Sequence, residues 1–325
     1  MNNAFRENIE KFKEQLTLRG VILEQSDKLK NNYDSIVIIG MGGSALAGDL
    51  LALTAQEIGL KLPVLVWKDY GLPSHIPGKN PLYIFASFSG NTEETLSGLN
   101  LLLKRKMGRN IALVTTGGEL RRLAKAHALP LARFPARTLT PRQSIGNIFY
   151  SLIKILQAAH LRLNVSSYDT LSIHSVEKAG LALARKLYKR LIVIYTDHAH
   201  LALAYIWKIK FNETAKSLAF MNVVPEMNHN ELVSLSHPQL PTTALFLTPP
   251  KLAPRLKKRF ALNSRLIKSN KIPIINVPLN GRKNLEQAWR TIMLADWTSY
   301  HLAKLRKLDP QETRIIDTLK NALAS

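Results

Sequence analysis

The clearest candidate for a binding site in the sequence is a glycine-rich turn. Residues 35–40 (SIVIIG) indicate a buried strand, which runs directly into Gly42, Gly43 and Ser44 and then into a helical pattern. Glycines permit close backbone approach, and the first N–H groups of a helix have no partner inside it. The arrangement predicts an anion site. Its spacing fits neither a dinucleotide-binding loop nor a P-loop.

A second turn carries an unusual density of hydroxyl groups. Ser87, Ser89 and Thr92 fall within one predicted strand-to-helix turn, beside Gly90. Neutral hydroxyl and backbone N–H donors in that number suit a phosphate dianion. The alternative is a helix start at which Thr92 acts as a capping residue, because Ser and Thr are favoured at that position.

The second half of the chain offers a carboxylate and a histidine in polar surroundings. Glu213 lies in NETAK, and His229 lies in PEMNHNE. A carboxylate and an imidazole can serve as acid–base partners. The alternatives are structural: Glu213 could pair with Lys210 or Lys216, and His229 could cap a helix through the neighbouring asparagines.

Short apolar runs alternate with helix-length segments in two series. The predicted strands are 35–40, 63–67, 82–87 and 111–116, then 191–196, 216–220, 243–248 and 273–278. The main predicted helices are 44–58, 91–107, 144–160, 198–212 and 283–304. This alternation predicts an α/β protein with two doubly wound units, each a parallel sheet flanked by helices. The polar stretch 163–170 divides them into domains 1–164 and 165–325.

Composition limits the classes of protein that remain. The 325 residues contain no cysteine, which excludes thiol nucleophiles, iron–sulfur clusters and Cys-ligated zinc. The polar start and the lack of any run of 18 apolar residues predict a cytoplasmic protein without a membrane span. The net charge of +22 predicts affinity for anions, yet no basic tail or DNA-reading motif accompanies it, so specific nucleic-acid binding is not expected.

The two turns carry a family resemblance. IIGMGGSALAGD and SFSGNTEETL are similar to the sugar isomerase (SIS) domain, a doubly wound fold that binds phosphosugars. The resemblance implies that the hydroxyls of the two loops hold the sugar phosphate. The residues that it assigns to this role are Gly43, Ser44, Ser87, Ser89 and Thr92.

The pattern NE-x-AK followed by PE-x-NHNE resembles the bifunctional phosphoglucose/phosphomannose isomerase family over nearly the whole chain. The resemblance implies an aldose–ketose isomerase of 6-phosphosugars that needs no metal or other cofactor. It makes Glu213 the base between C1 and C2, and His229 the ring-opening group contributed by the partner subunit of a homodimer. Arg142 matches the arginine that stabilises the enediolate, although a surface position before a helix is the alternative.

The chain end adds two further matches. Lys320 matches a ring-opening lysine, and Thr313, two helical turns earlier, matches a threonine that admits either C2 epimer. The sequence departs from the family at Thr214, where asparagine is usual. Rival interpretations are a non-catalytic phosphosugar-binding or regulatory SIS protein and a different SIS reaction. His198 and His200, beside Asp197, indicate helix N-terminal residues more than a metal site.

Overall fold

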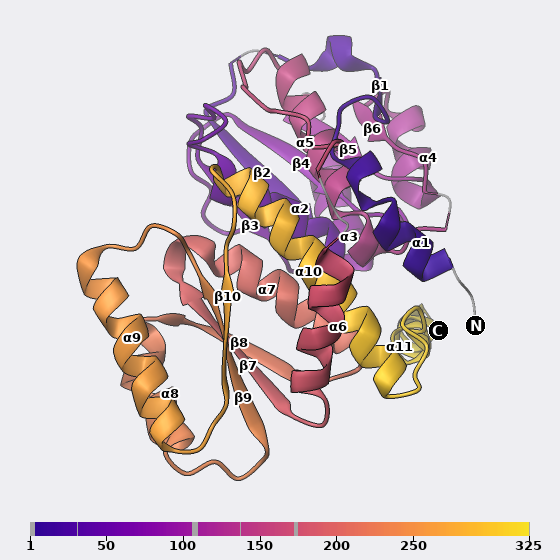
Figure 1. Ribbon diagram of the computed structural model, residues 1–325. Coiled ribbons are helices and arrows are strands. Elements are labelled where there is room, and N and C mark those ends of the chain that lie inside the picture. Colours follow the sequence, from indigo (N-terminus) through magenta and orange to yellow (C-terminus); the bar gives the residue numbers. More distant parts are fainter. Residues whose placement is uncertain (1–3, 31, 106–109, 137, 172–174, 325) are drawn as a thin grey trace. The chain divides into compact units, whose positions relative to one another are not determined.

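A computed structural model describes residues 4–30, 32–105, 110–136, 138–171 and 175–324 (Figure 1). The chain forms two compact units. The amino-terminal unit comprises residues 10–171 and 283–285, and the carboxy-terminal unit comprises residues 1–9, 172–282 and 286–325. The domain boundary at 164/165 stays a prediction; the change from one compact unit to the other falls after Leu171.

The amino-terminal unit is built on a six-stranded sheet of order β1-β6-β5-β4-β2-β3. Its strands are β1 (Ile22–Glu24), β2 (Ser35–Gly40), β3 (Val64–Trp67), β4 (Pro81–Ala86), β5 (Ile111–Val114) and β6 (Leu131–Arg133). All pairs are parallel except β1 with β6. Every residue of β2 and β4 is buried, as expected for central strands covered on both faces.

The helices described in this unit are η1 (Phe12–Gln15), η2 (Ser26–Lys28), α2 (Gly42–Thr54), α3 (Glu93–Lys104), α4 (Gly118–Ala126), η4 (Pro141–Gln143) and α5 (Ile145–Ala158). Of these, α2, α3 and α4 follow β2, β4 and β5 directly, in the βα order of a doubly wound fold. One core cluster joins Val37, Phe85 and Leu113 of the sheet to Leu99 and Leu120 of α3 and α4. Burial of this apolar face holds the strand ends, and the loops that follow them, in place.

The carboxy-terminal unit has a four-stranded, fully parallel sheet of order β10-β9-β7-β8. The strands are β7 (Leu191–Asp197), β8 (Ala219–Val224), β9 (Thr242–Thr248) and β10 (Ile274–Pro278). The longer helices are α1 (Ala4–Glu10), α6 (Val176–Leu187), α7 (Leu201–Ile209), α9 (Pro254–Ser269), α10 (Asn284–Leu305) and α11 (Arg314–Ala324). Short elements are η5 (His198–His200), the π-helical η6 (Lys210–Thr214), η7 (Glu226–His229) and α8 (Glu231–Leu235).

The predicted doubly wound α/β class is confirmed, and most strand positions agree within two residues. The strand expected at 216–220 begins at Ala219 instead, because the π turn and the residues after it occupy that stretch. β1 and β6 were not predicted; each has three residues, too few for a clear alternation. The interpretation of His198 and His200 as helix N-terminal residues is confirmed, since Asp197 Oδ1 accepts a hydrogen bond from the His200 N–H at 3.1 Å.

None of the helices in the described ranges is long and apolar enough to cross a membrane.

Candidate functional site

Two loops meet at the carboxyl edge of the first sheet. Gly40 at the end of β2 pairs with Ala86 at the end of β4. A Cβ on Gly40 would lie 2.6 Å from the Ala86 carbonyl oxygen, so the strands approach here as only glycine allows. Beyond them, the Ser44 hydroxyl accepts a hydrogen bond from the Phe88 N–H at 3.0 Å. The structure therefore brings the two predicted phosphate-binding turns into contact.

Two of the three hydroxyls of the second loop are joined by a hydrogen bond, and the third accepts one from the backbone. Ser87 Oγ and Thr92 Oγ1 are 2.8 Å apart, and the Gly90 N–H donates to Ser87 Oγ at 3.0 Å. Ser89 Oγ accepts a 3.3 Å bond from the Asn91 N–H. Thr92 occupies the N-cap position of α3, but the hydrogen bond recorded for its hydroxyl goes to Ser87. Its hydroxyl thus serves the loop, which counts against the simple capping interpretation.

The same loop packs against the loop that follows β5, which was not predicted from the sequence as part of the site. Gly90 has φ +76°, and a Cβ there would lie 2.0 Å from the Gly117 carbonyl oxygen. Asn91 Oδ1 accepts a hydrogen bond from the Glu119 N–H at 2.8 Å, and Thr116 Oγ1 donates to the Phe88 carbonyl at 2.7 Å. The loop after β5 therefore braces the hydroxyl loop, and its signal in the sequence is the Thr-Thr-Gly-Gly run that follows the strand.

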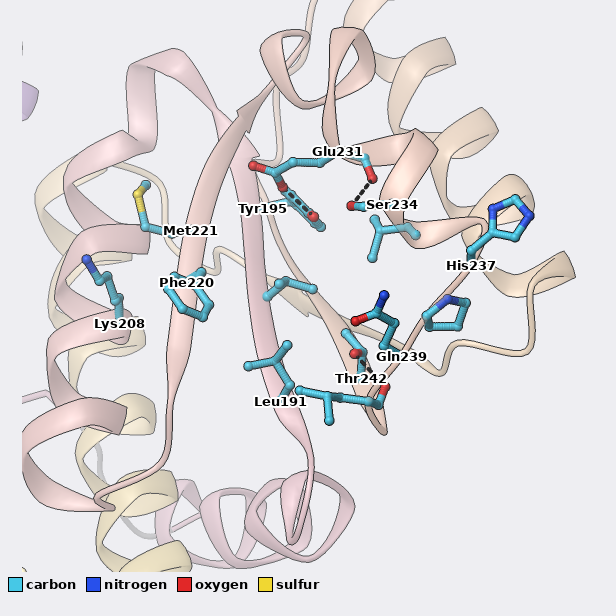
Figure 2. Close-up of a pocket in the computed structure, with 14 residues that line it drawn as sticks. Leu191, Tyr195, Lys208, Phe220, Met221, Glu231, Ser234, His237, Gln239 and Thr242 are labelled. Carbon is cyan, nitrogen blue, oxygen red and sulfur yellow. Dashed lines mark hydrogen bonds between the residues drawn. The ribbon is translucent and has the colours of Figure 1, made fainter.

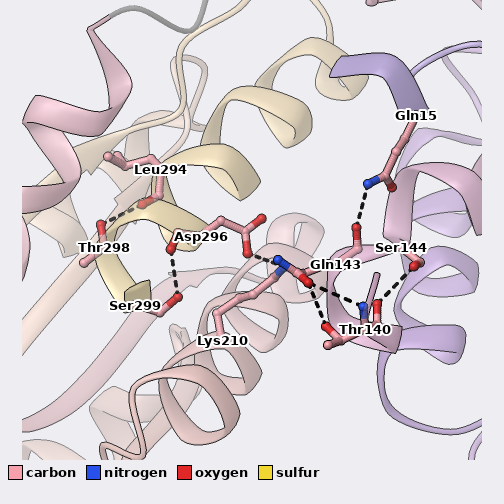
Figure 3. A network of polar contacts seen from close by, with 9 residues as sticks. All are labelled: Gln15, Thr140, Gln143, Ser144, Lys210, Leu294, Asp296, Thr298 and Ser299. Carbon is pink, nitrogen blue, oxygen red and sulfur yellow. Dashed lines mark hydrogen bonds and ion pairs between the residues drawn. The ribbon is translucent and has the colours of Figure 1, made fainter. Parts of the chain in front are cut away.

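Arg142 lies beside the first loop. It belongs to η4, which packs so closely on α2 that a Cβ on Gly43 would stand 2.9 Å from the Arg142 backbone nitrogen. Gln143 completes a capping box with Thr140, and its carbonyl accepts from Gln15 Nε2 at 2.8 Å (Figure 3). Arg142 is 3% exposed, which contradicts the alternative of a surface residue. A buried arginine, whose backbone packs against Gly43, thus lies beside the anion-binding turn in space.

Glu213 lies on a π turn at the end of α7. Single π turns occur frequently at functional sites. Lys210 is the first residue of this turn. Its Nζ forms a 2.5 Å ion pair with Asp296 of α10, and both side chains are at most 3% exposed (Figure 3). Asn212 Oδ1 accepts from the Ala219 N–H at 2.9 Å, which fixes the turn to the amino end of β8. Glu213 itself is half-buried.

His229 lies at the other end of the same strand. It closes η7, which follows a cis Val224–Pro225 peptide just after β8, and it is exposed. β8 has six residues, so about 20 Å of strand separates the turn that carries Glu213 from the loop that carries His229. Within one chain the two predicted acid–base residues are therefore not brought together.

Thr313 lies directly before α11, and Lys320 lies within that helix. Lys216 Nζ donates to the Asp309 carbonyl at 2.5 Å, which ties the segment before α11 to the residues after the π turn. The Thr313 carbonyl accepts from the Ile316 N–H at 2.9 Å, and Lys320 lies two turns into α11 on its exposed surface. No group of three or more His, Asp or Glu side chains that could hold a metal ion occurs among the residues that the structure describes.

Comparisons with known proteins define the class. Residues 177–323 match the family described as the bacterial phospho-glucose isomerase C-terminal SIS domain. A hypothetical protein of Thermus thermophilus has the same fold, with a TM-score of 0.70 and 16% identity over 99% of this chain and 86% of that one. The fold is thus that of a protein with two SIS domains.

Closer relatives give the family. The bifunctional phosphoglucose/phosphomannose isomerase of Thermoplasma volcanium is 32% identical over 96% of this chain and 98% of its own. The enzyme of the same name from Caldicellulosiruptor bescii is 33% identical over 90% of each chain. The chain belongs to the bifunctional phosphoglucose/phosphomannose isomerase family.

Proposed function

We propose that this protein is an aldose–ketose isomerase that interconverts glucose 6-phosphate and mannose 6-phosphate with fructose 6-phosphate through a cis-enediolate. The observation that carries the proposal is the contact between the two loops, in which Ser44 meets Phe88 beside the linked hydroxyls of Ser87 and Thr92, in a chain of this family. Such a site fits a phosphate monoester, because it offers hydroxyl and N–H donors at a helix start.

Phosphate binding falls to the amino-terminal unit. Gly43, Ser44, Ser87, Ser89 and Thr92 hold the dianion, and Arg142 adds a permanent positive charge nearby. Because Arg142 is buried, its charge acts through a medium of lower dielectric constant than water and is worth more there. A guanidinium suits the enediolate oxygens of the intermediate, since it offers several fixed donors and stays cationic.

Proton transfer falls to Glu213. Its carboxylate takes the C2 proton of the open-chain aldose, which gives the cis-enediolate. A proton then moves from the C2 hydroxyl to the C1 oxygen, and the Glu213 carboxyl returns its proton to C1 as the C2 carbonyl forms. No proton is gained or lost overall. His229 and Lys320 open the ring by moving a proton between the C1 hydroxyl and the ring oxygen.

The position of His229 supports its contribution from a second copy of the chain. One hexose cannot touch both ends of β8, whereas acid–base groups work at hydrogen-bond distance. In a homodimer, His229 of the partner subunit can lie next to Glu213, so that one substrate contacts both residues. Thr313 is the residue proposed to leave room for either C2 epimer.

Mixed dimers test the proposal most sharply. Glu213→Gln and His229→Ala chains, each inactive with fructose 6-phosphate, are mixed, partly unfolded in urea together and refolded, and both aldoses are followed. Each hybrid dimer holds one intact site, so about one quarter of wild-type activity returns when the chains are equal in amount and pair at random. If both parent chains remain folded and the hybrids stay inactive, the exchange of His229 between subunits is contradicted. If the wild-type protein produces neither aldose from fructose 6-phosphate, the proposed function is contradicted.

A further inference from the structure

One face of the second sheet is only half covered. Leu191, Val193 and Tyr195 of β7 point to this face, and strand register places Phe220 beside Val193 and Asn222 beside Tyr195. At the Tyr195 end, α8 and α9 complete a core cluster that includes Phe246 and Phe260. At the Leu191 end there is instead an open groove of about 730 Å³, bounded by β8, α8 and residues 237–240 (Figure 2).

The floor of this groove is apolar and accessible, whereas the side chains of Lys208, Ser234, His237 and Gln239 add polar groups to its lining. Phe220 is 49% exposed and Leu240 is 59% exposed, and Leu191, Val193 and Leu235 complete the apolar lining. A buried sheet face is normally covered by a helix in a doubly wound fold. Contiguous exposed apolar surface of this kind marks an interaction site.

The polar end of the groove is already satisfied from within. Tyr195 donates to one oxygen of Glu231 at 2.7 Å, and Asn222 Nδ2 donates to the other at 2.6 Å. Burial and the Glu231 carboxylate raise the pKa of the Tyr195 phenol, so it stays protonated and keeps donating. The groove therefore offers an apolar floor beside a carboxylate that already has hydrogen-bond partners, which suits a segment with one apolar face and polar edges.

The carboxy-terminal helix α11 has a matching surface. Ile315, Leu319 and Leu323 recur every four residues and are 80%, 60% and 60% exposed. Residues at this spacing form one stripe along a helix. Eleven helical residues span about 16 Å, which is close to the length of the strand that borders the groove. Lys320 follows Ile316 by four residues and therefore lies at the edge of the stripe.

We infer that the apolar stripe of α11 from a second copy of this chain docks in the groove between β8 and α8. The inference rests on the proposed exchange of His229. α8 begins two residues after His229 and lines the groove through Glu231, Ser234 and Leu235, so a contact that starts at His229 and continues along α8 reaches the groove. The receiving end of that copy, around Glu213, is the end to which the segment before α11 is tied.

Docking has a consequence for the reaction. Seating the stripe fixes the rotation of α11 about its own axis, and Lys320 at its edge is then held in one orientation. A two-fold dimer forms the contact twice, once in each direction, as an isologous interface requires. Lys320 would thus be ordered by the same association that supplies His229.

Disulfide trapping tests the docking without reference to turnover. The chain contains no cysteine, so Leu319→Cys combined with Phe220→Cys introduces the only two thiols. The control pairs Phe220→Cys with Asn321→Cys, because residue 321 lies on the opposite side of α11 from residue 319. We expect oxidation to give a covalent dimer containing the 319–220 linked peptide, in at least about five-fold higher yield than the control.

Each other outcome overturns the inference. A 319–220 disulfide within a monomer shows that α11 folds back on its own chain. No yield above the control shows that the groove does not receive the stripe. The hybrid-dimer assay separates this inference from the proposed function, because hybrids that regain activity without the 319–220 link contradict only the docking surface.

Discussion

Gly43 lies directly against Pro141: a Cβ on Gly43 would stand 2.6 Å from the Pro141 carbonyl oxygen and 2.7 Å from its carbonyl carbon. These are backbone atoms that cannot rotate away, so any larger residue must push η4 off α2. Because Arg142 follows Pro141, this glycine sets the distance between the phosphate-binding turn and the backbone that carries Arg142.

Gly43→Ala is therefore expected to impair catalysis through Arg142. We expect kcat/KM for fructose 6-phosphate to fall by at least about 10-fold, with a loss of both phosphate affinity and enediolate stabilisation. Gly20→Ala is the matched control, since nothing lies within 4 Å of a Cβ there and the residue belongs to neither phosphate-binding loop. Steady-state kinetics and a thermal unfolding scan of each variant make the comparison; equal kcat/KM for Gly43→Ala and wild type would contradict the role of the contact.

The sequence predicted the parts of the site that are formed by neighbouring residues, but it did not predict contacts between residues far apart in the chain. The turns at Ser44 and at Ser87 could be predicted because strand, small residues and helix follow one another directly. Arg142 came only from a resemblance, since nothing near it in the chain reveals that it packs on Gly43 almost a hundred residues earlier. The ion pair of Lys210 with Asp296 spans 86 positions and left no spacing to recognise.

The π turn and the two shortest strands could not be predicted either, because their sequences carry no distinct pattern. A π turn differs from an α-helix by one inserted residue, and residues 198–212 keep a helical apolar pattern up to it. The strand β8 begins at Ala219, separated from the end of this turn by residues 215–218, and so later than the sequence predicted. The antiparallel edge pairing of β1 with β6 was equally invisible, because three-residue strands carry almost no period.

The Ser87–Thr92 hydroxyl pair predicts a binding defect. Thr92→Val keeps the shape of the side chain and removes the oxygen that lies 2.8 Å from Ser87 Oγ. Loss of a hydrogen bond to a charged phosphate is worth about 1.5–3 kcal/mol, so KM should rise roughly 10- to 100-fold. Ser97→Ala, which removes a hydroxyl one and a half turns further along α3, should leave KM unchanged. An unaltered KM in Thr92→Val would remove Thr92 from the phosphate site.

His301 predicts how stability changes with pH. Burial lowers the pKa of this imidazole, against an opposing influence from Glu177 on α6 and alongside the positive charges of Arg6 and Arg185. The ring also stacks on Trp297, with centroids 5.7 Å apart. Because the unfolded chain binds the proton more readily than the folded chain, stability falls as the pH drops through the ordinary value of 6.5 toward the lower folded value.

His301→Gln removes this titration while keeping a polar side chain. Denaturant unfolding from about pH 7.5 to about pH 5.5 should show a shallower loss of stability in the variant, by at most about 1.4 kcal/mol per pH unit. Parallel curves for the two proteins would show that His301 does not titrate differently on folding.

The buried pair of Lys210 and Asp296 predicts a positioning effect on Glu213. Lys210 begins the π turn, and Glu213 is three residues further along it. Removing one member of a buried ion pair leaves an unpaired charge and typically costs about 3–5 kcal/mol. Asp296→Asn should therefore be strongly destabilised, and its kcat should fall more than its KM rises, because the phosphate loops lie in the other unit and remain intact.

The double variant Lys210→Met/Asp296→Leu distinguishes positioning from bare stability. Apolar replacement of both partners removes the unpaired charge, so the free energy of unfolding should return close to that of wild type. If the ion pair aims the π turn, kcat remains depressed in this restored protein, and the pH profile of kcat shifts because the surroundings of Glu213 have changed. Recovery of kcat together with stability would show that the pair supports the fold of the turn without directing the Glu213 carboxylate.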